Sequence, residues 1–539
     1  MGYILGINWK WHDASAALID ESGQLQYFCE EERLNRIRHS WLELPRRAAA
    51  WCLESAGIES IDLDAIAIGW DLEAKKAWLS SDRSEFYEAF LPHLRHGSKV
   101  PELVFVRHHL AHAASTFYSS GFSKAAILVV DGSGEEHSIS IYSGSSDGIK
   151  PLRSWHRGYS LGAMYDAATT LLGLGDLAEG KTMGLASYGR ALGAPYLVEH
   201  SLSEDGPGLI SGSPSGNADY AEHKGHWCQR LTERFGEVTT GADLLDRDVV
   251  AVRIAASVQR TVEEVMRELH AEATCLSGTN QVCLAGGVAL NSVANGRLPE
   301  PLFVPPFAHD AGVALGAAWT LRPPSEQRRL MSPYLGSGLD SGYADLARDY
   351  GHRLKEFDPS RVAHLLASGL IGAVVEGRAE IGPRALGHRS IIARPHPSGM
   401  RDKVNLRKGR ELWRPLAPVT TDRYADKLWP RNGARDLYMT GNTFVSELAR
   451  AQMPAAVHVD GTTRPQRLPS SHAGALSDIL KAMEARGDAP ILINTSFNGP
   501  GEPIVDTAAH AISAYDRLGL DFLILGDSLL ERPCPMRPN

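Results

Sequence analysis

Residues 124–144 read KAAILVVDGSGEEHSISIYSG, and this stretch decides the fold that we expect. The apolar run AAILVV predicts a strand, the glycine-rich DGSGE a tight turn, and HSISIY, which alternates apolar and polar residues, a second strand. The same order opens the chain, where YILGIN at 3–8 is followed by ASAALID at 14–20, the turn ESG and the strand-like QLQYFCEE at 24–31. This repetition predicts two related halves, each of which begins with strands.

Helical patterns follow these strands. The stretches EEERLNRIRH at 30–39, LPRRAAAWCLESAG at 44–57 and RIAASVQRTVEEVMRELHAEA at 253–273 have helical periodicity, and AIAIGW at 65–70 predicts another strand. Strands alternating with helices predict an α/β fold. We expect the polar stretch from about 195 to 245 to be a surface excursion. The Pro-, Gly- and Ser-rich residues 322–342 predict a linker, with a second domain from residue 343.

Composition excludes several classes of protein. The 539 residues carry a net charge of −9, so the chain has no overall attraction for nucleic acid or anionic lipid, and neither is expected as a partner. The six cysteines form no CxxC pair, which indicates reduced thiols and a cytoplasmic protein rather than a disulfide framework or a thiolate zinc site. No apolar run is long enough to span a membrane. The first twenty residues do not read as a signal peptide.

Three histidines stand within the small, apolar segment RHHLAHAAS at 107–115. His108 and His112 are spaced four residues apart, which places both imidazoles on one face of a helix. Asp131 follows the run AAILVV, and Asp310 opens the apolar DAGVALGAA. Two imidazoles and two carboxylates suit Fe(II), Mn(II) or Mg(II), with zinc an open alternative. The other interpretation is that these are ordinary core or surface histidines.

Two glycine-rich turns could approach a phosphate. DGSGE contains Gly132 and Gly134, and LAGGVALN contains Gly286 and Gly287. Backbone N–H groups at such turns bind phosphates without interference from a Cβ, but the same glycines could simply make tight turns. Neither turn is a P-loop or a Rossmann fingerprint.

The segment from Arg378 to Arg414 is strongly basic, with ten basic residues and three acids, and so carries a charge of +7 within an acidic chain. A solvated basic face is one interpretation. Because these residues are interleaved with turns and with Trp413, rather than spaced along a helix face, we favour a pocket for a compact anion. The polar residues after ILI in ILINTSFNGPGEPIV, which include Asn494 and Ser496, could complete that pocket or form an ordinary capped turn.

Taken in order, the motifs resemble the O-carbamoyltransferase family that includes the tobramycin, cephem and nodulation-factor carbamoyltransferases. The resemblance covers nearly the whole chain. It rests on HDASAAL at 12–18, HHLAHAAS at 108–115, VVDGSGE, EGKTMGLASYG at 179–189, LAGGVALNSVANGRL at 284–298, DAGVALGAA, EGRAEIGPRALGHRSI, KGRELWRPLAP and NTSFNGPGEPIV.

The resemblance implies a fold and an activity. Residues 1–335 would form a carbamoyl-transfer domain like the tRNA threonylcarbamoyltransferase subunit, with the doubled RNase H-like fold of the actin/Hsp70 class. Residues 343–539 would form a YrdC-like α/β domain that makes carbamoyl adenylate from carbamoyl phosphate and ATP. The carbamoyl group would then pass to a hydroxyl of a natural product, such as an antibiotic or its sugar, whose identity these motifs do not separate.

The resemblance also implies roles for residues. The metal, usually iron in this family, would be held by His108, His112, Asp131 and Asp310, and His109 would be a bystander. His12 with Asp13 would act as the base for the acceptor hydroxyl, and Arg384 would be essential for adenylate formation. The remaining binding residues for nucleotide, carbamoyl phosphate or adenylate would be Gly132, Gly134, Lys181, Gly286, Gly287, Asn291, Lys403, Arg414, Asn494 and Ser496.

Three residues depart from the family pattern: His309 replaces a small residue, and Ile381 and Trp413 stand where Phe is common. The sequence disfavours three rival functions. A tRNA-modifying transferase is disfavoured by the acidic charge, a hydrogenase-maturation carbamoyltransferase by the absence of CxxC repeats, and a non-catalytic actin/Hsp70-type nucleotide-binding protein by the Arg-rich second domain. Apolar helices such as RRAAAWCLESAG could serve an interface between copies of the chain.

Overall fold

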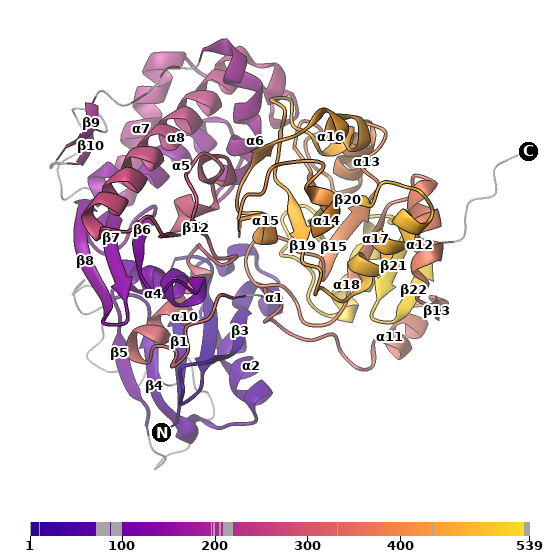
Figure 1. The fold of residues 1–539 in the computed structure, drawn as a ribbon, viewed down its shortest axis with the longest axis horizontal. Helices are drawn as coiled ribbons and strands as arrows, with labels where there is room; N and C mark the ends of the chain where they lie inside the picture. Colours follow the sequence, from indigo (N-terminus) through magenta and orange to yellow (C-terminus); the bar gives the residue numbers. More distant parts are fainter. Residues whose placement is uncertain are drawn as a thin grey trace, which may run out of the picture. The chain divides into compact units, whose positions relative to one another are not determined.

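The computed structural model describes residues 2–9, 11–71, 87, 100–193, 195, 197, 200–203, 206–208, 219–330, 332–433 and 435–532. These residues divide into two compact units. The first runs up to Ser332 and also takes in Asn432–Arg435 and Thr440–Asn442, and the second contains the rest (Figure 1). Cys534 and parts of the 195–245 stretch lie outside the described residues.

The first unit contains two five-stranded sheets with the same topology. The first sheet has β1 (Tyr3–Asn8), β2 (Ser15–Ile19), β3 (Leu25–Glu30), β4 (Leu63–Ile68) and β5 (Glu102–Phe105) in the order β3-β2-β1-β4-β5. The second has β6 (Ala125–Val130), β7 (His137–Ser145), β8 (Gly148–His156), β11 (Val282–Ala285) and β12 (Leu302–Phe303) in the order β12-β11-β6-β7-β8. In each sheet the opening strand pairs antiparallel with the next strand and parallel with the fourth.

This equivalence confirms the prediction of two related halves. Each half has the strand order of an RNase H-like sheet, and the doubled arrangement is that of the actin/Hsp70 class. The turn DGSGE joins β6 to β7, as the sequence predicts, and Asp131 directly follows β6.

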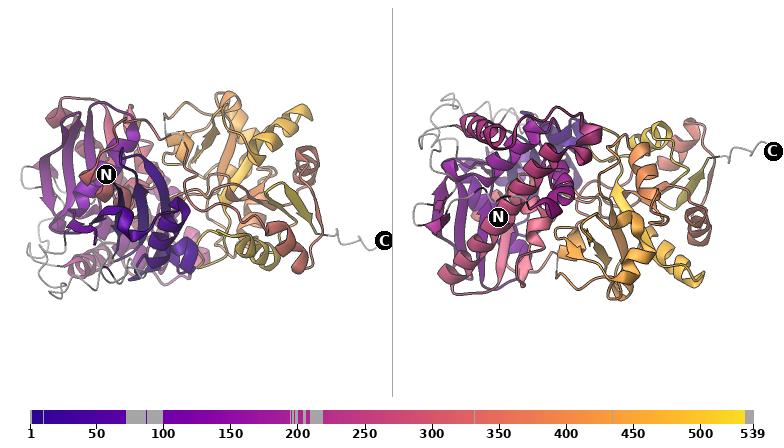
Figure 2. Two further views of the ribbon diagram at one scale, coloured as in Figure 1. Left: turned by 90° about the horizontal axis from the view of Figure 1, so that it is seen from below. Right: turned by 90° about the horizontal axis from the view of Figure 1, so that it is seen from above.

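Helices cover both sheets of this unit. They are α1 (Glu31–Asn35), α2 (Arg46–Ala56), α4 (His108–Ser120), α5 (Leu161–Leu171), α6 (Glu179–Gly189), α7 (Tyr220–Phe235), α8 (Val249–Ser277), α9 (Ser292–Asn295) and α10 (Ala311–Leu321). Helix α8 buries an apolar face against the second sheet, where Ile254, Val258 and Leu269 join the core of β6 and β11. In the view from above in Figure 2, the long magenta helix α8 lies in front of the second sheet.

Two helices cross between the halves. Helix α4 follows the first sheet but packs against β6 and β11 of the second, whereas α10 follows the second sheet and packs against β1 and β2 of the first. Helices α4 and α10 also pack closely against each other, because a Cβ added at Gly316 of α10 would lie 1.8 Å from the Ala111 carbonyl oxygen of α4. Helix α10 packs equally closely on β1, because a Cβ added at Gly6 would lie 1.9 Å from the Ala314 carbonyl oxygen. Glycine is therefore required at both contacts.

Two expectations about this unit are wrong in part. The helix expected over 30–39 ends at Asn35, because Arg36 adopts a left-handed conformation with φ 64°. Part of the expected surface excursion is the helix α7, which starts with an Asp219 capping box and buries Trp227 and Leu231. The polar residues on the outer face of α7 hid its helical pattern.

The second unit is an α/β unit built on one mixed sheet of order β13-β22-β21-β14-β15-β20-β16-β19. Its strands are β13 (Leu354–Glu356), β14 (Gly372–Val375), β15 (Arg389–Ala393), β16 (Ala417–Thr421), β19 (Gln466–Leu468), β20 (Ile491–Ser496), β21 (Phe522–Leu525) and β22 (Ser528–Glu531). Its helices include α11 (Tyr343–Asp349), α12 (Pro359–Ala367), α13 (Met400–Arg407), α17 (Ala475–Ala485) and α18 (Ala508–Arg517). The α/β class expected for this part of the chain is confirmed.

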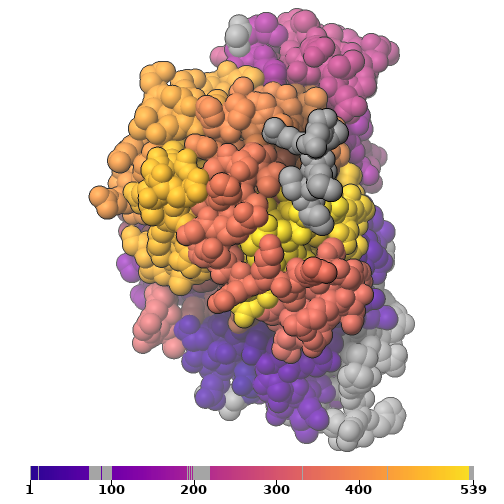
Figure 3. Space-filling view, turned by 90° about the vertical axis from the view of Figure 1, so that its right-hand side faces the viewer, coloured from indigo at the N-terminus to yellow at the C-terminus, as the bar shows by residue number. Residues whose placement is uncertain are grey.

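Both ends of the second unit meet in space. Strand β13 pairs antiparallel with β22, and α11 packs against α18. Figure 3 shows the salmon start and the yellow end of this unit adjoining on one face. None of the helices in the described part of the chain is long and apolar enough to cross a membrane.

Candidate active site

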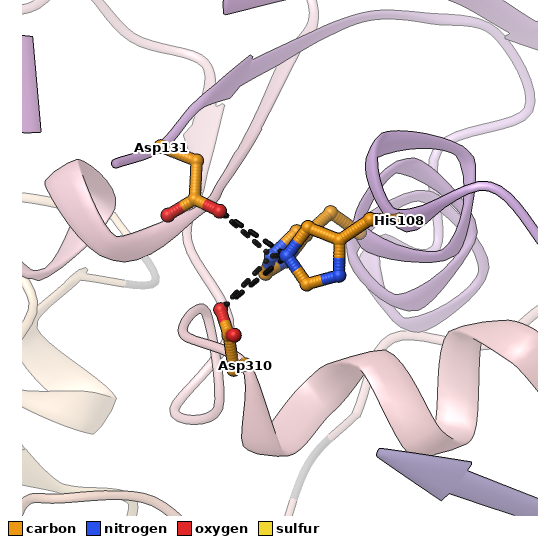
Figure 4. Close-up of side chains that lie close together, drawn as sticks. His108, Asp131 and Asp310 are labelled. Atoms are coloured by element: carbon orange, nitrogen blue, oxygen red, sulfur yellow. Dashed lines mark hydrogen bonds and ion pairs between the residues drawn. The ribbon is translucent and has the colours of Figure 1, made fainter. Parts of the chain in front are cut away.

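Four buried side chains from three separate parts of the first unit converge at one point. His108 and His112 come from the first two turns of α4, Asp131 follows β6, and Asp310 directly precedes α10. The two histidine Nε2 atoms are 3.1 Å apart, and His108 Nε2 lies 3.2 Å from Asp131 Oδ2. Figure 4 shows both carboxylates pointing toward the imidazole of His108. We call these four residues the quartet.

The quartet has the donor set and spacing of a metal site. Asp310 Oδ1 lies 3.6 Å from His108 Nε2 and 3.4 Å from His112 Nε2, and Asp131 Oδ2 lies 3.6 Å from His112 Nε2. Four donors that each lie about 2.1 Å from one cation have separations of this size. The four ligand atoms lie close enough together to hold one ion.

Hydrogen bonds and ring packing from residues outside the quartet orient its side chains. The Nδ1–H of His108 donates to the Gly69 carbonyl at 3.1 Å, which turns Nε2 toward the carboxylates. The Gly287 N–H donates to Asp131 Oδ1 at 2.8 Å. The Trp70 ring stacks on His108 with centroids 3.9 Å apart. Such hydrogen bonds from outside fix the tautomer and the angle of a metal ligand.

The carboxylates dominate the electrostatics of the quartet. Burial by itself lowers the pKa of His108, but the charges of Asp310 and Asp131 outweigh it and raise that pKa to about 10. Burial opposes ionisation of Asp131 as well, yet the two histidines hold its pKa well below the usual range. The cluster therefore strongly favours positive charge between its carboxylates.

His109 faces away from the quartet. Its Nδ1 pairs with the Ser140 hydroxyl at 2.8 Å, and burial lowers its pKa to about 3. It packs against the turn after β6, where a Cβ at Gly134 would lie 2.9 Å from the His109 ring. The structure therefore places His109 apart from its two neighbours in the helix.

The glycine turns approach the quartet. Gly286 has φ 94°, and a Cβ there would lie 2.3 Å from the Val130 carbonyl oxygen, so the turn brings Gly287 against Asp131. In the first turn, the Ser160 hydroxyl donates to the Gly132 carbonyl at 2.6 Å. The turn DGSGE thus begins with Asp131 itself, and the turn LAGGVALN is bonded to Asp131 through Gly287.

Asn291 and Lys181 are engaged with protein groups. The Asn291 amide forms a reciprocal pair with the amide of Gln259, at 2.9 and 3.1 Å, and its Oδ1 also caps α9. The Lys181 ammonium donates to the Leu174 carbonyl at 3.3 Å. Sequence reasoning did not identify Gln259, which lies in the middle of α8 with no local motif around it.

His12 and Asp13 lie in the turn between β1 and β2, beside the quartet. His12 Nδ1 donates to Asp13 Oδ2 at 3.0 Å and lies 4.0 Å from Asp310 Oδ2. Burial lowers the pKa of His12, but the Asp310 charge and the Asp13 hydrogen bond raise it to about 10. A cation held by Asp310 would remove much of this effect.

Asp13 also binds a histidine that sequence reasoning missed. His39 Nδ1 donates to Asp13 Oδ1 at 2.8 Å, so the carboxylate bridges two imidazoles. Burial raises the pKa of Asp13, but His39 and His309 outweigh this and hold it well below the usual range. The sequence pattern predicts His39 within a helix, and no spacing rule links it to residue 13. His309 is buried, 3.6 Å from Glu30 Oε1.

A second constellation lies at the end of β20 in the C-terminal unit. The Asn494 amide donates to Gln466 Oε1 at 2.7 Å, and the Ser496 hydroxyl donates to Asn498 Oδ1 at 2.7 Å. Lys408, which is fully buried, donates to Asn498 Oδ1 at 3.0 Å and to the Ser496 carbonyl. Burial, together with Arg410 and Arg414, holds the pKa of Lys408 well below its usual range.

Several arginines lie near these residues. Arg410 donates to the hydroxyls of Thr495 and Ser496 at 3.3 Å each. Burial, with Arg384, Arg410 and Arg414 close by, holds the pKa of Arg464 well below its usual range. Burial lowers the pKa of Arg384 to about 10. We call Arg384, Lys408, Arg410, Arg414 and Arg464 the cation group.

The cation group differs from the predicted set. The structure brings Arg384 and Arg414 together near Asn494 and Ser496, but Lys403 is exposed on α13. Sequence reasoning missed Lys408, Arg410 and Arg464. Lys408 and Arg410 lie within the basic segment from Arg378 to Arg414 and within the family motif KGRELWRPLAP, whereas Arg464 lies fifty residues beyond that segment, with no local signal.

Fold and sites together define a two-unit α/β enzyme of the actin/Hsp70 fold class, with a candidate metal site in one unit and a candidate anion site in the other. Two family models match the chain: Carbamoyltransferase N-terminus at residues 3–319 and Carbamoyltransferase C-terminus at residues 363–532. The chain therefore belongs to the carbamoyltransferase family and is a carbamoyltransferase. This confirms the resemblance seen in its motifs.

Curated relatives agree with the family models. Nodulation protein NolNO of Sinorhizobium fredii is 35% identical over 97% of this chain and 79% of its own length. Nodulation protein NolO of Bradyrhizobium diazoefficiens is 34% identical over 80% of each chain, and Nodulation protein U of Azorhizobium caulinodans is 28% identical over 93% of this chain and 94% of its own. Among solved structures, HypF of T. kodakarensis is 14% identical with a TM-score of 0.34, over 60% of this chain and 47% of that chain, which adds nothing to the assignment.

Proposed function

We propose that this carbamoyltransferase is ATP-dependent: it forms carbamoyl adenylate from carbamoyl phosphate and ATP, and transfers the carbamoyl group to an acceptor hydroxyl. The observation that carries the proposal is the cation group. Four arginines and a lysine lie around the end of β20, where burial first, and then the charges of Arg410 and Arg414, hold the pKa values of Arg464 and Lys408 well below their usual ranges. Such a concentration of positive charge favours a bound anion.

The substrates of adenylate formation are polyphosphates and an acyl phosphate, which match the cation group in charge. Each charge-assisted hydrogen bond to a phosphate contributes about 1.5–3 kcal/mol. One acid lies close to the cation group, because a carboxylate oxygen of Glu411 is 3.5 Å from a guanidinium nitrogen of Arg414. The Nε of Arg464 is buried and has no hydrogen-bond partner among the residues that the structure describes.

The adenylate carries a good leaving group, AMP, and the first unit supplies a base for the acceptor hydroxyl. We propose that His12, held by Asp13, takes the proton of the acceptor hydroxyl as its oxygen attacks the carbamoyl carbon. AMP then leaves with the electron pair of the broken acyl–oxygen bond. A base of this kind contributes about 10²- to 10⁴-fold to the rate. Gly132, Gly134, Gly286, Gly287, Asn291 and Lys181 are the proposed nucleotide-binding residues of this unit.

The quartet is proposed to hold a divalent cation, with iron as our first choice and manganese or magnesium as alternatives. A cation held there would supply positive charge for phosphate oxygens. The acceptor is proposed to be a hydroxylated small molecule, such as an antibiotic or its sugar. We assign carbamoyl transfer to residues 1–335 and adenylate formation to residues 343–539.

Mass spectrometry of the reaction without acceptor tests the proposal. The protein is incubated with carbamoyl phosphate, ATP and a divalent metal, and carbamoyl adenylate is expected. Arg464→Ala should reduce its formation at least about tenfold, because this change removes one charge-assisted contact. His12→Ala should spare the adenylate and slow only the transfer to an acceptor.

Arg407→Ala is the matched control. Arg407 lies one residue before Lys408, is exposed, and forms a 3.7 Å surface pair with Asp521, so its loss should leave adenylate formation unchanged. If ATP and carbamoyl phosphate stay unconsumed with metal bound, or if Arg407→Ala and Arg464→Ala behave alike, the cation group is not the adenylate-forming site.

A further inference from the structure

Residues 381–388 form an irregular loop between β14 and β15 and carry Arg384 of the cation group. We call them the Arg384 loop. Gly382 and Gly387 in this loop have φ 91° and 128°, which glycine adopts readily and other residues do not. An irregular loop depends on groups from elsewhere to bind its backbone N–H and carbonyl groups and so to fix its shape. The position of the Arg384 guanidinium therefore depends on those groups.

One carboxylate binds the backbone N–H groups of the Arg384 loop. Glu380 Oε1 accepts hydrogen bonds from the N–H groups of Leu386 at 2.6 Å, Gly387 at 3.2 Å and Arg389 at 3.3 Å. Backbone N–H groups that converge in this way form a nest for an anion. The nest begins two residues after Arg384, and the protein's own carboxylate, on a residue that is 1% exposed, occupies it.

The carbonyl groups of the same loop are bound by side chains from other elements. The Tyr334 hydroxyl and the Gln466 amide both donate to the Leu386 carbonyl, at 2.9 and 2.7 Å. The Asn494 amide donates to the Ala385 carbonyl at 3.2 Å. The peptide groups of the loop are therefore held on both sides, by a carboxylate on their N–H groups and by neutral donors on their carbonyls.

The charge of Glu380 makes it a strong constraint on this backbone. Burying a carboxylate is costly unless it is hydrogen-bonded and its charge is balanced. The three N–H groups bind it, and the fully buried Arg389 carries the opposite charge at the start of β15. Hydrogen bonds to an ionised acceptor are roughly twice as strong as those to a neutral one. A neutral residue of the same shape would therefore hold the Arg384 loop less firmly.

We infer that Glu380 is a positioning residue for adenylate formation: its buried carboxylate fixes the backbone that follows Arg384 and so directs the Arg384 guanidinium into the cation group. The inference rests on the proposed function, in which Arg384 binds the substrate phosphates. Because Glu380 is buried, it acts through Arg384 and not on the substrate. A displacement of about 1 Å in a group that positions a substrate can lower a rate about 10²-fold.

A double-mutant cycle tests the inference. The Kd for carbamoyl phosphate is measured by isothermal titration calorimetry, and kcat/KM for adenylate formation by mass spectrometry, in the intact protein, Glu380→Gln, Arg384→Ala and the double variant. Glu380→Gln keeps the shape of the side chain and removes its charge, and it should lower kcat/KM at least about tenfold and raise Kd. The double variant should have the same Kd as Arg384→Ala, because Glu380 then has no guanidinium to position.

Tyr334→Phe keeps the inference testable if Glu380→Gln folds poorly. This change removes one of the two donors to the Leu386 carbonyl, while the ring can remain stacked on His388, with centroids 3.5 Å apart. It should raise the Kd for carbamoyl phosphate by a smaller factor than Glu380→Gln does. That effect should also disappear when Arg384 is replaced by Ala.

Glu376→Gln is the matched control. Glu376 lies four residues before Glu380, and its carboxylate accepts the Ala475 N–H at 3.0 Å at the beginning of α17. It therefore holds a helix and not the Arg384 loop. Adenylate formation and the Kd for carbamoyl phosphate should be unchanged in Glu376→Gln.

The possible failures can be told apart. If the intact protein makes no adenylate, the proposed function fails, and the role of Glu380 in it falls too. If adenylate forms, an unchanged Kd in both Glu380→Gln and Tyr334→Phe overturns the inference alone. So does a double variant that binds carbamoyl phosphate more weakly than Arg384→Ala, or a Glu376→Gln variant that loses as much as Glu380→Gln, because the effect would then be general damage to this unit.

Discussion

His108 and His112 show how far local sequence can define a site. Their spacing of four residues on a helical segment predicts that both rings share one face, and the structure places their Nε2 atoms 3.1 Å apart. His109 differs from them only in its direction around the helix, and it faces Ser140 instead. Residue chemistry alone does not distinguish these three histidines, but helical geometry does.

Removing one member of the quartet should therefore release the metal. His112→Ala, reconstituted with Fe(II) and analysed by inductively coupled plasma mass spectrometry, should lose most of its bound metal. At a hundredfold excess over Kd, the metal should add about 2.7 kcal/mol to the free energy of unfolding of the intact protein. It should add nothing to the free energy of unfolding of His112→Ala. His109→Gln is the control and should bind metal normally. Equal metal content in both variants would exclude His112 as a ligand.

At the scale of elements, the quartet depends on the crossing of α4 and α10. These helices start beside each other, so His108 at the beginning of α4 meets Asp310 at the beginning of α10. Their close approach requires Gly316, where a Cβ would lie 1.8 Å from a backbone oxygen of α4. The apolar repeat DAGVALGAA predicts a buried helix, but it does not say which helix packs on it.

Gly316→Ala should force the two helices apart. We expect a loss of about 1–3 kcal/mol or more in the free energy of unfolding, the usual cost of overpacking a tight contact, measured by urea denaturation. Gly225→Ala is the matched control in the middle of α7, where nothing lies within 4 Å of the added Cβ. It should be neutral or stabilising by up to about 1 kcal/mol. An unchanged free energy of unfolding in Gly316→Ala would show that α4 and α10 can move apart without loss of stability.

At the scale of the whole molecule, the division into units does not follow the order of the chain. Asn432–Arg435 and Thr440–Asn442 belong to the first unit, although they lie within the segment that matches the C-terminal family model. Arg435 is 2% exposed and binds the carbonyls of Asn295 and Leu298 and the carboxylate of Glu300. The Asn295 amide in turn donates to the Thr440 carbonyl at 2.8 Å.

Arg435→Ala should destabilise the first unit in particular. Two buried carbonyls would lose their donor, at a cost of about 1–3 kcal/mol each, and amide hydrogen exchange should accelerate around α9. Arg431→Ala is the control, because its side chain is 61% exposed and pairs only on the surface with Asp422 and Asp426. Unchanged exchange at residues 292–298 would mean that Arg435 contributes nothing to that unit.

The sequence by itself determined the α/β class, the two related halves, the family, and the residue types that gather at both candidate sites, because strand and helix periodicity, turn glycines and short motifs are local properties. Only the tertiary structure decided which of those residues meet. It placed Lys408, Arg410 and Arg464 beside Asn494 and Ser496, left Lys403 exposed on α13, and joined His39 to Asp13. Such pairs depend on the packing of segments far apart in the chain, and no periodicity carries that information.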